Sequence, residues 1–375
     1  MFDIKRTRLT KTIIIAILLA SLTFFGCTGP RGWPGVVAND DTLFVGSMDG
    51  RVLALNPASG ARVWDWKPKA KQTGGAGGFL TCTTGQQFAG GAFYGPPVVA
   101  NGLVYMGGYV GIVYAIDAAR GVEVWRYDIG STVAAGIAVD DGTVFVGSSN
   151  GKISALDAGN GTLKWEFPSK NQVWATPAVA DGIVYFGSLD HNLYALYATN
   201  GAEKWIFPTG GGIASTPLLV DGVVYIGSFD KKFYALYADT GTPKWVFDKA
   251  GNWFWSEALY GNGTIYTVCL DHHVYALDAG NGTMVWSKPF ETSSLVKSSP
   301  VISGGVLVVA SEDGKVYGLD LKTGQEKWPN IDLETKVLAP LYTDGEKVYI
   351  NAESNRLYAL DGETGRQNWS VAIGE

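Results

Sequence analysis

The hydrophobic and polar positions of this chain recur as short apolar runs separated by turn residues. The clearest example, residues 184–207, reads V-Y-F-G-S-L-D-H-N-L-Y-A-L-Y-A-T-N-G-A-E-K-W-I-F. Val184–Gly187 and Leu193–Leu196 are rich in aromatic and β-branched residues, which favours strands, and turn residues separate them. Asn200-Gly201 supplies the positive φ of a tight hairpin, and a strand with a tryptophan follows. With a short strand over Pro177–Ala180, the pattern predicts a four-stranded antiparallel meander.

This unit repeats along the chain. Tryptophans recur at intervals of 40 to 42 residues, with one interval of 61 between the first two. Each has a Gly four residues before it and a small residue ten before it. A β-unit of this length is one propeller blade, so we expect an all-β fold, a single eight-bladed β-propeller of four-stranded antiparallel blades. A residue present in every blade defines no unique site, so we expect these tryptophans to be structural: Trp64, Trp125, Trp165, Trp205, Trp245, Trp286, Trp328 and Trp369.

The N-terminal residues have the pattern of an export signal. Residues 1–26 combine a basic beginning with the apolar run Ile13–Phe25, which is shorter than a comfortable membrane span. Gly26-Cys27 resembles a bacterial lipobox, although Phe24-Phe25 departs from its usual residues. We therefore predict a lipoprotein-type signal peptide over 1–26, lipidation of Cys27, a tether over 27–35 and a propeller over 36–375. The alternative is an uncleaved N-terminal anchor with a bystander cysteine.

Composition and charge restrict the function. The formal net charge is −6, and removal of the basic residues 1–26 makes it more negative. With no basic stripe, nucleic acid is not an expected partner. Fifty Gly residues and 13% aromatics are typical of a turn-rich β protein rather than a disordered one.

The largest departure from the repeat is an insertion over 67–94, between blades one and two. Its Gly, Thr and Gln content predicts a long loop. We consider it a candidate segment for partner binding, with a tolerated surface insertion as the alternative.

The links between blades also differ from one another, and in a propeller they end near the central axis. Counting eight residues back from each following turn predicts that aromatic residues line one mouth of the axial channel, with two lysines opposite. Such a mouth could bind a planar or acidic ligand or a partner segment. Alternatively, the aromatic residues plug the axis as core. The candidates are Tyr94, Trp174, Trp253, Phe254, Trp255, Lys297 and Lys336.

Other residues suggest sites less strongly. Asp271-His272-His273 and Asp190-His191 have the types of metal ligands, but they occupy turns that other blades also fill with Asp, so we predict no metal site. Cys82 and Cys269 could pair in an oxidising compartment, although nothing in the sequence places them together.

The recurring pattern G-S-x-D-x-x-x-Y-A-L-D-x-x-T-G-x-x-x-W, fullest at 187–205, 227–245 and 310–328, resembles the PQQ-type propeller repeat. One branch of that family is the quinoprotein dehydrogenases. The other is the non-catalytic eight-bladed lipoproteins similar to BamB, an accessory of the outer-membrane β-barrel assembly machinery. The dehydrogenases imply a tricarboxylate quinone, a divalent ion and often a disulfide between adjacent cysteines. This chain has no adjacent cysteines, and Glu257 is the one acid that the register places beside the aromatic mouth.

The resemblance therefore favours a non-enzymatic, membrane-anchored scaffold on the periplasmic or cell-surface side, binding protein partners in the cell envelope. We expect a monomer with no catalytic residues, cofactor or metal, contacting the membrane through its lipidated N-terminus. Two alternatives stay open, a PQQ-dependent dehydrogenase and a sensor propeller that binds a small molecule or glycan. The sequence does not indicate how the ring is closed.

Overall fold

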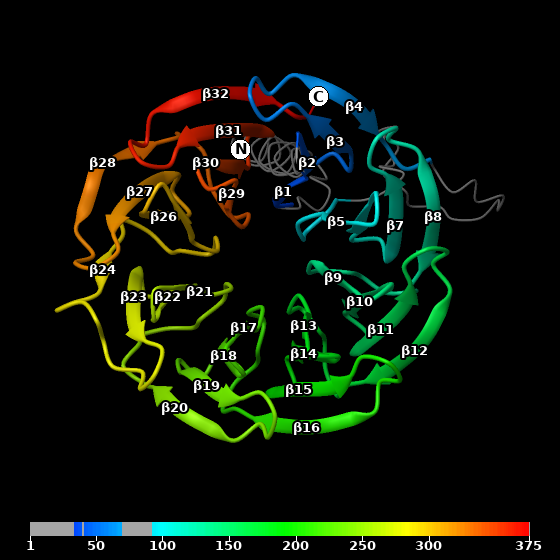
Figure 1. Cartoon of the computed structure of the whole chain (residues 1–375), viewed down its shortest axis with the longest axis horizontal. Coiled ribbons are helices and arrows are strands. Elements are labelled where there is room, and N and C mark those ends of the chain that lie inside the picture. Colours follow the sequence, from blue (N-terminus) through cyan, green and yellow to red (C-terminus); the bar gives the residue numbers. More distant parts are fainter. Residues whose placement is uncertain (1–33, 40, 70–91, 375) are drawn as a thin grey trace, which may run out of the picture. The chain divides into compact units, whose positions relative to one another are not determined.

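The computed structural model describes residues 34–39, 41–69 and 92–374, which form strands and no helix. No segment within those ranges is a helix long and apolar enough to cross a membrane. The strands form eight antiparallel sheets, and each sheet contains four strands that are consecutive in the sequence. Figure 1 shows the sheets arranged as blades around a central axis. The prediction of an all-β, eight-bladed propeller is confirmed.

The first four blades contain β1 (Val36–Asn39), β2 (Thr42–Gly46), β3 (Val52–Leu55), β4 (Arg62–Trp66); β5 (Val98–Ala100), β6 (Leu103–Gly107), β7 (Ile112–Asp117), β8 (Glu123–Asp128); β9 (Ile137–Asp140), β10 (Thr143–Ser148), β11 (Lys152–Asp157), β12 (Leu163–Pro168); and β13 (Ala178–Ala180), β14 (Ile183–Gly187), β15 (Asn192–Tyr197), β16 (Glu203–Pro208).

The last four blades contain β17 (Leu218–Val220), β18 (Val223–Gly227), β19 (Phe233–Tyr237), β20 (Pro243–Phe247); β21 (Leu259–Gly261), β22 (Thr264–Val268), β23 (His273–Asp278), β24 (Phe290–Glu291); β25 (Val301–Ser303), β26 (Val306–Ala310), β27 (Lys315–Asp320), β28 (Glu326–Asp332); and β29 (Tyr342–Thr343), β30 (Lys347–Ala352), β31 (Arg356–Asp361), β32 (Gln367–Ala372).

Blade four shows how the local sequence builds a blade. Asp181 and Gly182 join β13 to β14 with φ values of 52° and 72°, the left-handed pair of a type I′ hairpin turn. The second strand, β14, is buried along its whole length, because the blade packs against a neighbour on each face. The outer strand β16 alternates more exposed and more buried positions, as expected for a strand at the rim.

The repeated Trp and Gly form the contact between neighbouring blades. Gly201 has a φ of 70°, and a Cβ there would lie 2.5 Å from Cε3 of Trp165 in the preceding blade. The indole therefore packs directly on the glycine backbone, and its Nε1–H donates to the Ala198 carbonyl at 2.9 Å. Each of the eight glycines meets the tryptophan of the preceding blade in this way, and Gly60 of blade one meets Trp369 of blade eight.

Among the described residues, side chains rather than a shared strand join the first blade to the last. Blade one contains only β1–β4 and blade eight only β29–β32. A buried apolar cluster joins these two blades. Asn351 adds polar contacts, because its Nδ2 donates to the carbonyls of Pro34 at 2.7 Å and Gly46 at 3.1 Å. The Nε1–H of Trp369 donates to the Pro57 carbonyl at 3.1 Å.

Candidate functional site

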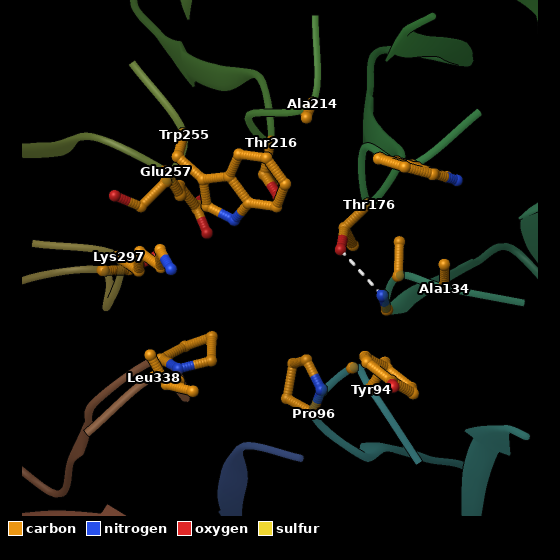
Figure 2. A pocket seen from close by; sticks show the side chains of 17 residues that line it. Tyr94, Pro96, Ala134, Thr176, Ala214, Thr216, Trp255, Glu257, Lys297 and Leu338 are labelled. Atoms are coloured by element: carbon orange, nitrogen blue, oxygen red, sulfur yellow. Dashed lines mark hydrogen bonds between the residues drawn. The ribbon is translucent and has the colours of Figure 1, made fainter. Parts of the chain in front are cut away.

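The links between blades and the turns between the second and third strands lie at the same end of the ring, which we call the mouth. Beneath the mouth is an axial cavity, and the cavity and its opening enclose about 490 Å³. Seven consecutive links supply its walls. Figure 2 shows their side chains around the central space, with Trp255, Glu257 and Lys297 across from Thr176 and Ala134.

Each of the seven links that line the cavity contributes residues to it in the same pattern. Each link bends near the axis, and the residues immediately before and after the bend both line the cavity. We call the first residue of each pair the outer tier and the second the inner tier. The pairs are Tyr94/Pro96, Ala134/Gly136, Trp174/Thr176, Ala214/Thr216, Trp255/Glu257, Lys297/Ser299 and Leu338/Pro340. Sequence reasoning located most of the outer tier but, apart from Glu257, missed the inner one, although a spacing of two after each outer residue would have found it.

Four of the candidate residues line the cavity. They are Tyr94, Trp174, Trp255 and Lys297. Trp253 does not line it but is 43% exposed. Its ring stacks on Phe229 with centroids 4.6 Å apart, and Phe229 stacks on Trp255 at 5.6 Å. The three rings form a continuous aromatic stack from the surface of the mouth to the cavity wall.

Phe254 lies in the core rather than at the mouth. Its side chain is 0% exposed and packs against Phe233 and Tyr275, at centroid distances of 5.4 and 6.3 Å. The physical reason is the alternation of the extended link, which directs Phe254 opposite to its neighbours Trp253 and Trp255. This placement differs from the expectation from sequence that all three adjacent aromatic residues share one surface.

The expectation for Lys336 also needs correction, because the register of blade eight is shifted by one residue. Leu338 lines the cavity there, and Val337 is buried. In blade five the hairpin turn is Asp221-Gly222, whereas the pairing of Tyr342 with Tyr349 puts Gly345-Glu346 at the equivalent turn. Gly345 is therefore equivalent to Asp221, the first residue of the turn in blade five, and not to Gly222. Counting back from Gly345 placed the link of blade eight one residue too early.

The two lysines share one carboxylate. Lys297 Nζ lies 2.9 Å from Glu312 Oε2, and Lys336 Nζ lies 3.2 Å from Glu312 Oε1. Burial disfavours the charged form of Glu312, but the two lysines outweigh it and hold the pKa of that carboxyl below its usual value. Both ammonium groups are thus engaged in a three-residue ion cluster, and of the two lysines Lys297 also lines the cavity.

Glu257 has the opposite environment. It lines the cavity and makes no hydrogen bond or ion pair with any described residue. Burial alone raises the pKa of Glu257 to about 7. Next to it, the buried hydroxyl of Ser256 also lacks a partner in the described part of the chain, although the equivalent Ser215 donates to the Gly227 carbonyl at 2.8 Å.

The remaining candidates are the Asp-His pairs and the cysteines, and those that the structure describes lie in turns or in the core. Asp190 Oδ2 accepts from the Tyr194 hydroxyl at 2.6 Å, and His191 occupies the turn with a φ of 76°. No group of three or more His, Cys, Asp or Glu suited to a metal occurs among the residues described. Cys269 is buried, and burial raises its pKa to about 12. Cys27, Cys82 and most of the insertion lie outside the described residues.

The cavity does not fit a tricarboxylate quinone. Such a ligand needs several cationic or hydrogen-bonding partners and an acidic ligand set for a divalent ion. The charged side chains of the lining are Lys297, already paired with Glu312, and Glu257, whose carboxylate would repel the ligand, and its other polar side chains are neutral. The donor set therefore does not support quinone chemistry at this site.

Comparisons with known proteins agree with the fold. The family model described as "Outer membrane protein assembly factor BamB" matches residues 48–176, 109–211, 151–253 and 270–374. A BamB from Xanthomonas campestris is 33% identical over 110 residues, which are 29% of this chain and 24% of that protein. The match thus spans about a quarter of the relative's length.

Two solved structures resemble the propeller. The crystal structure of BamB from Moraxella catarrhalis has a TM-score of 0.69 at 19% identity, covering 88% of this chain and 94% of the other. The computationally designed Ika8 protein has a TM-score of 0.70 at 17% identity, covering 87% and 95%. These likenesses show the fold, while the family model covers most of the repeats. The chain belongs to the PQQ-like propeller family of the outer membrane protein assembly factor BamB.

Proposed function

We propose that this protein is a non-catalytic scaffold, tethered to a membrane outside the cytoplasm, that binds protein partners and assists the assembly of outer-membrane proteins. The observation that carries the proposal is the match of the BamB family model to most of the propeller. The unfavourable donor set for quinone chemistry supports the absence of catalysis. We further propose that the protein acts as a monomer.

We propose the mouth as the partner-binding surface. Trp253 is the exposed end of the stack with Phe229 and Trp255, and aromatic residues with such a packed base are typical anchors of protein interfaces. Lys336 lies at the same end and keeps a half-exposed side chain, which suits the polar rim of an interface. The insertion 67–94 is a second candidate surface, on sequence grounds.

Replacing Trp253 tests the surface. We expect Trp253→Ala to weaken binding to purified outer-membrane assembly machinery by at least about 1 kcal/mol, roughly fivefold in Kd, since truncating a packed aromatic anchor removes its contacts. Binding can be measured by surface plasmon resonance. The control is Tyr237→Ala, which removes a similarly exposed aromatic residue (48%) from the opposite end of blade five. Equal affinities of both variants and wild type would move the interface elsewhere, and a deletion of 68–92 would then test the insertion.

The membrane tether has its own test. We propose that Cys27 is the lipidated residue, because it follows a signal-like segment and a small residue. Cells expressing the wild type should incorporate labelled palmitate into this protein, and a Cys27→Ala variant should not. Label retained by the variant would rule out this cysteine as the attachment site.

A further inference from the structure

The axial cavity contains an acid that no residue in the described part of the chain neutralises. Glu257 belongs to the inner tier, where neighbouring blades place the neutral Thr216 and Ser299. No cation or hydrogen-bond donor of the described chain reaches its carboxyl group, and burial alone determines its elevated pKa. A half-buried carboxylate without a partner is costly, so a site that retains one is suited to a positively charged ligand.

The other ionisable groups of the cavity do not provide that charge. Lys297 and Tyr94 are the remaining titratable side chains in its lining. Lys297 is held by Glu312 at 2.9 Å. Burial and then the neighbouring Tyr109 raise the pKa of Tyr94, so it stays neutral. Once Glu257 loses its proton, its carboxylate therefore has no cation paired with it among the described residues.

The surroundings of Glu257 suit an ammonium group rather than a metal ion. The Thr216 side chain lines the same cavity. Its hydroxyl and the two carboxylate oxygens of Glu257 can accept the three hydrogens of a primary ammonium. The indoles of Trp174 and Trp255 provide apolar, electron-rich walls for the adjoining carbon chain. A divalent ion would need further carboxylate or histidine ligands, which the described cavity lacks.

We propose that the axial cavity binds a primary ammonium group on a short apolar chain, with Glu257 as its counter-ion, Thr216 as an acceptor and Trp255 as a wall. This goes beyond the scaffold function, because it assigns a small-ligand site to the hub of the ring. The ammonium could belong to a free aliphatic amine or to a lysine side chain of a bound protein. Both share the same chemistry at Glu257.

Calorimetric titration of the full-length protein with pentylammonium tests the proposal. We expect saturable binding that is about tenfold tighter at pH 8 than at pH 6, since the ionised fraction of a group with a pKa of about 7 rises by that factor while the amine stays charged. The neutral probe 1-pentanol should bind at least tenfold more weakly at pH 8. Nα-acetyl-lysinamide distinguishes the source: tighter binding than pentylammonium indicates a protein lysine, and weaker binding indicates a free amine.

Two variants sharpen the test. Glu257→Gln keeps the shape but removes the charge, so it should lose at least tenfold in affinity at pH 8 and all pH dependence. Glu326→Gln removes an exposed carboxyl on the outer strand of blade seven and should bind as the wild type does. Thermal melts check that both variants are folded. No saturable binding by the wild type in the millimolar range, equal binding of pentanol, or unchanged binding by Glu257→Gln would each overturn the proposal, whatever the outcome of the Trp253 test.

Discussion

At the residue scale, the repeated Asp and Tyr of the motif explain the geometry of the mouth. Asp271 Oδ2 accepts from the Tyr275 hydroxyl at 2.7 Å and from the Gly251 backbone N–H at 2.7 Å. Burial opposes ionisation, but these hydrogen bonds outweigh it and hold the pKa of Asp271 below its usual value. One carboxylate thus ties a hairpin turn to the link of its own blade, and Asp190 does the same with Tyr194 and Lys170.

Glu257 is the exception at this scale and gives a pH-dependent prediction. Its pKa rises from 4.5 to about 7 on folding, so between these values the unfolded chain loses the proton first. Stability should therefore fall as pH rises from 4.5 to 7, by roughly 3 kcal/mol at 1.36 kcal/mol per pKa unit. We expect Glu257→Gln to match the wild type near pH 4.5 and to be more stable by that amount at pH 8, measured by urea unfolding without amines. A less stable Gln variant at pH 8 would contradict this account.

At the element scale, a blade is held to the next by its outer-strand tryptophan, and blade seven departs from the rule. Trp328 packs on Gly365 as the others do, but its Nε1–H has no partner in the described structure. Gly318 replaces the usual alanine of that blade, and a Cβ there would lie 2.0 Å from Cε2 of Trp328. The indole occupies the space that an alanine methyl fills in other blades.

Trp165 and Trp328 can therefore be compared to measure the contribution of the indole hydrogen bond. Trp165→Phe should lose packing and also leave the Ala198 carbonyl without its indole donor, a further cost of about 0.5–1.5 kcal/mol. Trp328→Phe loses only packing, because the donor that it removes was unpaired. We therefore expect the smaller destabilisation for Trp328→Phe in denaturant unfolding. The reverse order would mean that packing differences exceed the hydrogen-bond term.

At the scale of the whole molecule, the seam between the first and last blades is non-covalent, and Asn351 is its buried polar contact. We expect Asn351→Ala to destabilise the protein by about 1–3 kcal/mol, because two carbonyls lose their donor inside the seam. Circular dichroism melts can measure this. Asn200→Ala, which alters an exposed turn between β15 and β16, is the control and should cost less. A seam variant as stable as the wild type would show that the apolar cluster alone closes the ring.

The sequence was sufficient for the architecture but not for the cavity. Spacing of Trp and Gly predicted the number of blades, because every copy must present the same contact to its neighbour. It could not predict that Lys297 and Lys336 share Glu312, since that cluster forms only when links and turns from neighbouring blades meet at the mouth. Phe254 was misplaced because counting along the link locates residues near the axis but does not give the direction of each side chain, and Lys336 because the turn glycine of blade eight comes one residue early.

Each described sheet is built from consecutive strands, and this bears on how such a protein can change in evolution. Every β-ladder lies within one continuous segment of about forty residues. Duplication or loss of such a segment in the gene would leave the hydrogen-bonded ladders of all other segments intact and would change only the contacts between neighbours. The fold is therefore suited to evolve by gaining or losing whole blades.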